Sequence, residues 1–353
     1  MTNINNSDLI LAPDIDSFKR LPLYDSEFGN IAAFMCYVLN PDGTPASGCT
    51  RNVLKKALEE MKGLGFTKLN IGFEPEFSIL KRKPADHKDT SVYLDSGTYA
   101  DAEGENDFTA HIRREIMFEL ERAGIVPLVS HHERAPSAYE IPYRYNDAMR
   151  ACDDLVLGKL ITKAVARKHG LYATFEPKPF DGVNGNGLNT NVSLSRNEQN
   201  VFVKDGGISD IAKNFLTGVL LHAESLCFLT NPTEDSYRRL VEGFEAPINI
   251  CWGYHNRSAM IRVPNASGES TRIEIRSPDC NMNPYLGVAG ILLAGLDGVT
   301  TKAILPRPID SDAGCHKNVP TLPRSIAEAK KAFLGSSLFS KFHFLQVGAV
   351  GET

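Results

Sequence analysis

The sequence has no surplus of positive charge. It contains 38 Lys and Arg residues against 43 Asp and Glu residues, and its net charge at pH 7 is −5. Proteins that bind nucleic acid or anionic membranes usually carry basic patches, so neither partner is indicated. No apolar run reaches the roughly 18–20 residues that cross a bilayer, and residues 1–14 lack the pattern of a signal peptide. These absences predict a cytoplasmic protein without a membrane or nucleic-acid partner.

Two common motifs are also missing. The seven cysteines form no Cys-x-x-Cys pair and their number is odd, so we expect reduced thiols that pack as small apolar side chains. The sequence has no GxxxxGKS or GxxxxGKT motif, which excludes a P-loop. A bound nucleotide would therefore need other groups to hold its phosphates.

Apolar periodicity divides the rest of the chain into strands and helices. The predicted strands are residues 31–39, 68–80, 125–133, 248–253 and 272–277. The predicted helices are residues 51–64, 107–123, 146–169, 209–229 and 285–296. Residues 82–106 are polar and irregular, which predicts a long loop. This order indicates an α+β or mixed fold, and periodicity leaves open whether the sheet is parallel or antiparallel.

Carboxylates recur on single faces of the predicted strands. In "GFEPEF", Glu74 and Glu76 point to one face of a strand, and Phe73 and Phe77 point to the other. Two carboxylates on one face raise each other's pKa unless a cation lies between them. A Glu-x-Glu pair is, however, also typical of a solvated strand face.

Further acidic residues follow the same logic. In "TRIEIRS", Glu274 shares a face with Arg272 and Arg276, and "HHERAPSAYE" adds Glu133 and Glu140. Oxygen donors suit Mg²⁺ or Mn²⁺ better than Zn²⁺. Taken singly, the Arg-Glu-Arg strand also fits a surface ion-pair ladder, and the two histidines before Glu133 fit a structural role better than a metal-binding one.

Arginine is concentrated in one part of the chain. Between residues 238 and 276 there are six arginines and no lysine, namely Arg238, Arg239, Arg257, Arg262, Arg272 and Arg276. Guanidinium groups favour bidentate binding of carboxylate and phosphate. An acidic cluster that binds divalent metal, next to arginines that bind phosphate, is typical of metal-assisted phosphoryl transfer.

The stretch "FEPKPFDGVNGNGLNTNVSL" at residues 175–194 is rich in Gly, Asn and Pro. Gly185 and Gly187 allow a positive φ and a close approach of the backbone to a ligand. The glycines alone leave open whether this is a surface turn, a phosphate-binding loop or a substrate clamp.

In order and spacing, seven segments resemble the signature blocks of the type I glutamine synthetase family. They are "NIGFEPEF", "SHHERAPSAYE", "ATFEPKPFDGVNGNG", "NPTEDSYRRLVEGFEAP", "NRSAMIRVP", "TRIEIRSPDCNMNPYL" and "AGLDGV". The resemblance implies an α+β fold with a curved antiparallel half-barrel sheet backed by helices. It implies a catalytic domain at residues 51–353 and a partial β-grasp segment at residues 1–50. The family's β-grasp aspartate, which helps to deprotonate ammonium, has no counterpart in the chain.

The resemblance also implies a role for each site residue. The implied ligands of a first divalent metal are Glu76, Glu133 and Glu140, and those of a second are Glu74, Glu274 and Asn189. The implied glutamate contacts are Asn184, Gly185, Arg239 and Arg276. The implied ATP contacts are Ser193 and Arg272, and the implied phosphate-stabilising residues are Arg257 and Arg262. Glu245 resembles the flap carboxylate that closes the ammonium site, and the 175–194 stretch resembles the glutamate-binding loop.

Several positions depart from the family pattern. Asn189 stands where the family has a histidine, and an amide oxygen is a weaker Mn²⁺ ligand than imidazole. Ser137 and Ala138 replace a Gly-Gln pair, and Glu176 replaces a methionine. We therefore expect the second metal site to be weak.

The resemblance predicts an ATP-dependent ligase with two Mg²⁺ or Mn²⁺ sites. Such an enzyme joins glutamate to ammonia or another amine through an acyl phosphate. One alternative is a weakly active or inactive homologue that binds nucleotide or glutamate as a regulatory module. Another is a different acyl-phosphate or guanidino phosphotransfer on the same fold. The family's double ring makes a homo-oligomer the expected form, with a dodecamer as one candidate.

Overall fold

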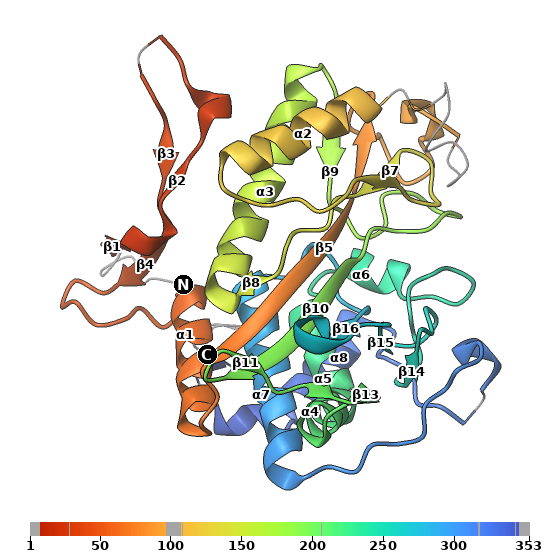
Figure 1. Cartoon of the computed structure of the whole chain (residues 1–353). Coiled ribbons are helices and arrows are strands. Elements are labelled where there is room, and N and C mark those ends of the chain that lie inside the picture. The colour runs from red at the N-terminus through yellow and green to blue at the C-terminus, as the bar shows by residue number, and fades with distance from the viewer. Residues whose placement is uncertain are drawn as a thin grey trace.

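A ten-stranded sheet forms the centre of the protein (Figure 1). The computed structural model describes residues 8–27, 29–96, 107, 109–205, 207–316, 318–342 and 344–345. Along the sheet, the strand order is β14 (Trp252–Tyr254), β15 (Ile261–Val263), β16 (Ile273–Ile275), β10 (Leu188–Arg196), β5 (Lys68–Leu80), β7 (Ala138–Glu140) and β6 (His131–His132). Beside this path, β11 (Gln199–Asn200) pairs with β10, and β8 (Asn146–Asp147) and β9 (Tyr172–Thr174) pair with β5. The sheet is curved and antiparallel, as predicted, except that β14 and β15 run parallel.

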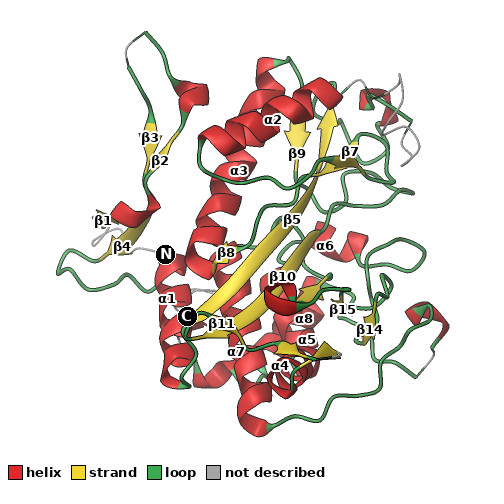
Figure 2. Ribbon diagram, viewed as in Figure 1, coloured by secondary structure: helices red, strands yellow, loops and turns green. Residues whose placement is uncertain are grey.

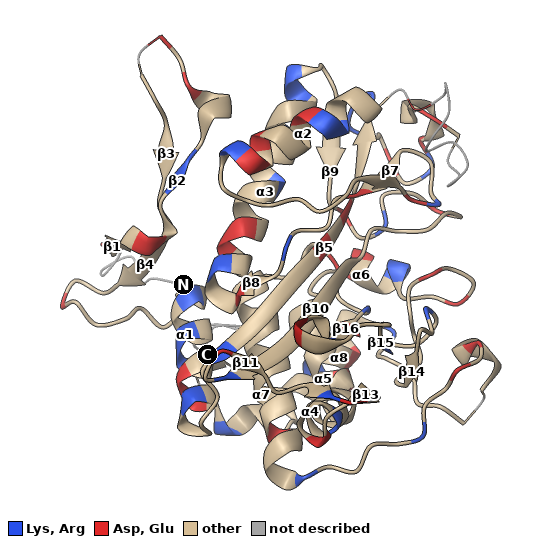
Figure 3. Ribbon diagram, viewed as in Figure 1, with Lys and Arg blue, Asp and Glu red and all other residues tan. Residues whose placement is uncertain are grey.

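The helices pack mainly against one side of this sheet (Figure 2). They are α1 (Thr50–Gly63), α2 (Ala110–Arg122), α3 (Ala148–Lys168), α4 (Asp210–Leu221), α5 (Ala223–Thr230), α6 (Glu234–Arg239), α7 (Pro284–Thr301) and α8 (Ile326–Leu334). Acidic and basic residues are interspersed along α1, α2 and α3 (Figure 3). This distribution agrees with the near balance of charge in the sequence.

β5 connects the core to the polar face of the sheet. It covers residues 68–80, as the apolar pattern predicts, and pairs with β10 along most of its length. Phe73 and Phe77 are each 1% exposed and belong to the main hydrophobic core. Because side chains alternate along a strand, Glu74 and Glu76 point to the opposite, polar face.

Several predicted elements differ from the structure in their bounds; the predicted helix at 285–296, for example, is the longer α7 (Pro284–Thr301). The predicted strand at 125–133 contains only β6, and the predicted strand at 248–253 corresponds to β14 at its far end. The predicted strand at 31–39 is divided into β3 (Ala32–Ala33) and β4 (Cys36–Leu39). The predicted helix at 209–229 is divided into α4 and α5 at His222. Part of the predicted loop at 82–106 lies outside the described residues.

A narrow antiparallel ribbon extends from the body near the N-terminus (Figure 1). In it, β1 (Ile10–Pro13) pairs with β4, and β2 (Lys19–Arg20) pairs with β3. The buried guanidinium of Arg51 joins ribbon to body, because its Nη2 lies 2.9 Å from Asp14 Oδ2 and 2.7 Å from Asp153 Oδ2. That this ribbon is part of a β-grasp domain, with a boundary near residue 50, stays a prediction.

α7 is apolar on almost all sides and lies in the core. Among the described residues, it is the one helix long and apolar enough to cross a membrane, and most of it is buried inside the protein. It crosses α4 closely because two glycines meet there. A Cβ on Gly218 would lie 2.1 Å from the Ala294 carbonyl oxygen, and one on Gly298 would lie 2.1 Å from the Asn214 carbonyl oxygen.

We therefore expect Gly298→Val to lower the free energy of unfolding by about 1–3 kcal/mol, because overpacking forces the two helices apart. The matched control is Gly63→Ala in α1, where an added Cβ meets nothing within 4 Å. That variant should be unchanged or more stable by up to about 1 kcal/mol. Urea denaturation compares the two, and equal stabilities would contradict the assigned α4–α7 crossing.

Candidate active site

Carboxylates from three strands meet on the polar face of the sheet. Glu74 and Glu76 come from β5, Glu140 from β7 and Glu274 from β16. Glu140 lies directly opposite Glu76 in the antiparallel register. The strand-face argument from the sequence therefore describes how these side chains come together.

The first acidic cluster consists of Glu76, Glu133, Glu140 and His131. His131 Nε2 lies 3.1 Å from Glu140 Oε1, and His131 Nδ1 lies 3.3 Å from Glu133 Oε1. Ligand atoms of His131, Glu133 and Glu140 lie within 4.8 Å of one another. The sequence favoured a structural role for this histidine, whereas the structure brings its ring into contact with two of the predicted metal ligands.

Burial and mutual repulsion keep protons on this cluster. Burial, with Glu140 nearby, raises the pKa of Glu76 to about 7. Burial, with Glu76 and Glu140 nearby, raises the pKa of Glu133 to about 9. The hydrogen bond to Glu140 raises the pKa of His131 to about 9. A divalent cation would neutralise the same carboxylates, and their oxygens are donors that Mg²⁺ and Mn²⁺ prefer.

The second acidic cluster consists of Glu74 and Glu274. Glu74 accepts hydrogen bonds from Asn189 Nδ2 at 3.2 Å and from Asn191 Nδ2 at 2.8 Å. Glu274 Oε1 accepts one from Arg276 Nη1 at 2.7 Å. Protein donors thus already contact both carboxylates. Asn189 lies opposite Glu74, but it presents its amide nitrogen rather than an oxygen to this group.

Part of the second cluster has room for another partner. Glu274 Oε2 lies 3.0 Å from Arg262 Nη2 without hydrogen-bond geometry. Glu274 Oε2 and Arg262 Nε are buried and have no hydrogen-bond partner in the described part of the chain. Unsatisfied buried polar atoms are costly, so they indicate a place for a ligand. A cation beside Glu274 or an anion beside Arg262 would satisfy them.

The 181–187 loop approaches the first cluster closely. The Gly187 N–H donates to Glu76 Oε2 at 2.7 Å, and a Cβ on Gly187 would lie 2.5 Å from Arg239 Nη2. A Cβ on Gly185 would lie 2.0 Å from the Pro177 carbonyl oxygen. Neither glycine has a positive φ. Close backbone approach, rather than left-handed conformation, is therefore the reason for glycine at these two positions.

The predicted flap carboxylate contacts this loop. Glu245 Oε2 accepts a hydrogen bond from Asn184 Nδ2 at 2.9 Å. Its Oε1 lies 3.3 Å from Arg134 Nη1, on the residue after Glu133. Sequence reasoning paired neither residue with Glu245 and did not single out Arg134, because no local pattern marks an exposed arginine in a loop.

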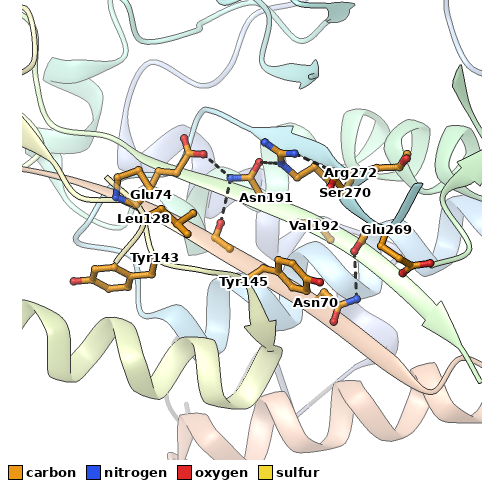
Figure 4. Close-up of a pocket in the computed structure, with 14 residues that line it drawn as sticks. Asn70, Glu74, Leu128, Tyr143, Tyr145, Asn191, Val192, Glu269, Ser270 and Arg272 are labelled. Atoms are coloured by element: carbon orange, nitrogen blue, oxygen red, sulfur yellow. Dashed lines mark hydrogen bonds between the residues drawn. The ribbon is translucent and has the colours of Figure 1, made fainter. Parts of the chain in front are cut away.

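A cavity of about 200 Å³ lies beside the second cluster (Figure 4). Its lining includes Glu74, Ser193 and Arg272, three residues that the sequence predicted for the site. Asn191 also lines it and accepts a hydrogen bond from Arg272 Nε at 2.8 Å. The sequence did not single out Asn191, although it shares a strand face with Asn189 and Ser193 and could have been found by that parity.

The remaining predicted arginines lie around these clusters. Arg239 is buried and its Nη1 donates to the Ser277 carbonyl oxygen at 2.9 Å. Arg276 is also buried and its Nε donates to the Arg257 carbonyl oxygen at 3.1 Å. The Arg257 side chain is exposed. Tyr145, which the sequence did not indicate, is 53% exposed and lines the cavity.

Comparisons with known proteins give a consistent result. A family model described as the catalytic domain of glutamine synthetase matches residues 47–347. A glutamine synthetase of Staphylococcus aureus (strain MW2) is 44% identical over 312 residues, which cover 88% of this chain and 69% of that protein. A glutamine synthetase of Staphylococcus epidermidis is 43% identical with the same coverage.

Solved structures agree with the sequence matches. A structure titled as a GmaS/ADP complex superposes with a TM-score of 0.87 at 30% identity, covering 99% of this chain and 81% of that one. A glutamine synthetase of Plasmodium falciparum superposes with a TM-score of 0.86 at 25% identity, covering 99% and 83%.

The raised pKa of Glu76 predicts how the stability of the metal-free protein depends on pH. A folded-state pKa of about 7 exceeds the ordinary value of 4.5. The folded state therefore binds more protons, and its stability falls as pH rises from about 4.5 through about 7. Glu76→Ala should flatten this decline in thermal melts recorded without metal. A decline of unchanged slope in the variant would contradict the assignment.

Metal binding gives a second prediction. Glu76→Ala and Glu140→Ala should each remove the Mn²⁺-induced rise in melting temperature while the fold survives, because each removes a carboxylate that the resemblance implies as a metal ligand. Glu119→Ala on α2, outside the cluster, is the control and should keep the response. If both variants unfold, or if neither changes Mn²⁺ binding by calorimetry, the first acidic cluster is not the metal site.

Proposed function

Because this chain belongs to the glutamine synthetase family and is a glutamine synthetase-like ligase, we propose that it forms a γ-glutamyl amide from glutamate and ammonia or another amine, with ATP and divalent metal. The main supporting observation is the arrangement of three parts on one sheet face. The first part is the first acidic cluster, which is rich in oxygen donors. The second part is the cavity next to the second acidic cluster. The third part is the set of buried arginines beside the two clusters.

The cavity is the proposed nucleotide site. Its wall combines the exposed ring of Tyr145 with the polar groups of Ser193 and Arg272. An aromatic ring suits a base, and a guanidinium suits phosphate oxygens. The similar GmaS structure is titled as a complex with ADP, which agrees with this assignment.

Two metal sites of unequal strength are proposed. Glu76, Glu133 and Glu140 would hold the first Mg²⁺ or Mn²⁺, which would neutralise charge on the transferring phosphoryl group. Glu74, Glu274 and Asn189 would hold the second. There the cation competes with hydrogen bonds from Asn189 and Asn191 to Glu74, and with the Arg276–Glu274 contact. This site would be the weaker of the two.

The chain's own residues would bind and orient the reactants. Asn184, Gly185, Arg239 and Arg276 are the proposed glutamate contacts. In the first step the glutamate γ-carboxylate attacks the γ-phosphorus of ATP and releases ADP, and Arg262 and Arg257 would offset the negative charge. In the second step the amine displaces phosphate from the acyl phosphate. Glu245 would hold the amine and accept its proton.

One observation favours a second candidate function. Amides already contact Glu74, and Arg262 and Arg276 lie beside Glu274, so protein groups compensate much of the second acidic cluster without a second metal. A homologue that binds nucleotide or glutamate as a regulatory module would keep the cavity and need no turnover. Phosphate release from ATP with Mg²⁺, glutamate and a panel of amines separates the two. Release that depends on an amine supports the ligase, and nucleotide binding without release supports the regulatory module.

The assembly and cellular location are proposed from relatedness. Members of this family are typically oligomeric, and we propose that this chain forms a cytoplasmic homo-oligomer. Light scattering coupled to size exclusion measures its mass directly. A monomer at assay concentration would contradict the proposed assembly.

Nucleotide binding should stabilise the fold. At about 100 times its Kd, a non-hydrolysable ATP analogue with Mg²⁺ should add about 2.7 kcal/mol to the free energy of unfolding. Arg272→Ala should reduce this gain, because it removes a cation from the cavity wall. Arg307→Ala, outside the cavity lining, serves as the control. No thermal shift up to millimolar analogue would count against the proposed nucleotide site.

Asn189→His tests the second metal site. If residue 189 faces that metal, imidazole should tighten Mn²⁺ binding at one site, because imidazole is a stronger Mn²⁺ ligand than an amide. The expected gain in binding free energy is roughly 1–2 kcal/mol, where a tenfold change in affinity equals about 1.4 kcal/mol. Calorimetric titration of Mn²⁺ measures the change. An isotherm identical to that of the wild type would place residue 189 outside the metal shell.

A further inference from the structure

A buried lysine lies between the two loops that carry Asn184 and Glu245. Lys178 is 3% exposed and belongs to neither acidic cluster. Its Nζ donates to the Val183 carbonyl oxygen at 2.5 Å, within the 181–187 loop. The same Nζ lies 3.7 Å from the ring centroid of Phe244, next to Glu245 in the 240–246 loop. One ammonium group therefore contacts both loops.

We propose that Lys178 is a positioning residue that fixes the Glu245 carboxylate relative to the 181–187 loop. The proposal rests on the proposed function, in which Glu245 holds the amine and Asn184 contacts glutamate. Lys178 acts through Phe244 and Val183 and touches neither reactant. It determines how well the amine is held, and so it acts on the amine step.

The 181–187 loop packs on the backbone next to Lys178. The Asn186 N–H donates to the Pro177 carbonyl oxygen at 2.9 Å, and Gly185 lies so close to that oxygen that a Cβ would be 2.0 Å from it. On the other side, Arg238 Nη1 donates to the Lys178 carbonyl oxygen at 3.4 Å. Hydrogen bonds to the carbonyl oxygens of Pro177 and Lys178 thus fix the backbone at Lys178, and this fixes the direction of its side chain.

A second contact between the 181–187 and 240–246 loops lies one residue further along each of them. Asn184 Nδ2 donates to Glu245 Oε2 at 2.9 Å, so a second bridge joins the same two loops. The Asn184 bridge lies at the proposed substrate and would be exchanged for substrate contacts. The Lys178 bridge lies outside the substrate contacts and would stay in place during turnover.

The charge of Lys178 is stabilised mainly by the aromatic ring and the carbonyl. Buried lysines usually pair with a carboxylate, because burial of an uncompensated charge is costly. Burial, followed by the nearby charge of Arg238, lowers the pKa of Lys178 to about 8, and Asp181 opposes this shift. A desolvated cation over an aromatic face is the situation in which a cation–π contact is strongest.

Two single variants and their combination test the proposal. Lys178→Met keeps the length of the side chain and removes its charge, and Phe244→Leu removes the aromatic face from a half-buried position. Each should raise KM for the amine about tenfold, equivalent to about 1.4 kcal/mol, with KM for ATP unchanged. The two variants share the lysine–aromatic contact, and Lys178→Met also removes the hydrogen bond to Val183. The double variant should therefore match Lys178→Met rather than show the sum of the two effects. Phe244→Tyr keeps the aromatic ring, and this variant should keep the wild-type KM for the amine.

A measurement that needs no turnover tests the role of Lys178 independently of the proposed ligase activity. Hydrogen exchange of residues 240–246, in the full protein with no substrate, should speed up in Lys178→Met and Phe244→Leu. Lys56→Met is the matched control, because it removes a lysine–aromatic contact on α1 outside the site. Unchanged exchange in both variants, or additive effects on KM, would overturn the role of Lys178. Absence of amine-dependent phosphate release in the wild type would instead overturn the proposed function.

Discussion

The site depends on electrostatic repulsion between carboxylates that the sheet forces onto one face. β5 alone brings two of them there, and its neighbours β7 and β16 add Glu140 and Glu274. Each buried carboxylate costs free energy unless a proton, a donor or a cation compensates it. The apolar residues on the opposite face of β5 make this cost tolerable, because they anchor the strand in the core. The helices behind the sheet complete that core.

The negative charge of the buried carboxylates is compensated differently in the two acidic clusters. In the first, burial and the neighbouring carboxylates raise the pKa of Glu133 to about 9, and the His131 ring lies against Glu133 and Glu140. The second is compensated by protein groups, two amides on Glu74 and two guanidinium groups on Glu274. Asn189, where the resemblance implies a histidine, donates one of these two amide hydrogen bonds. A metal that bound both carboxylates there would have to displace the hydrogen bonds from Asn189 and Asn191 to Glu74.

Local patterns in the sequence predicted the parts of the fold that depend on local physics. The 68–80 strand and the helix at α1 followed from periodicity, and strand parity placed Glu74 and Glu76 on one face. The predicted strand at 125–133 failed because only two of its residues pair with β7, and pairing is a property of distant residues. Arg134 and Tyr145 were missed because each is placed by contacts with segments remote in sequence. His131 was named, but a structural role was favoured for it, because its contact with Glu140 depends on the pairing of β6 with β7.

The central claim is that ATP activates the γ-carboxylate of glutamate before the amine attacks. Glutamate labelled with ¹⁸O in that carboxylate tests it directly, with ATP, Mg²⁺ and the amine that supports phosphate release. The account predicts that the phosphate released carries one labelled oxygen, transferred when the acyl phosphate breaks down. Phosphate without label, with three oxygens from ATP and one from water, would show that water rather than glutamate attacks ATP, and would contradict the proposed ligase mechanism.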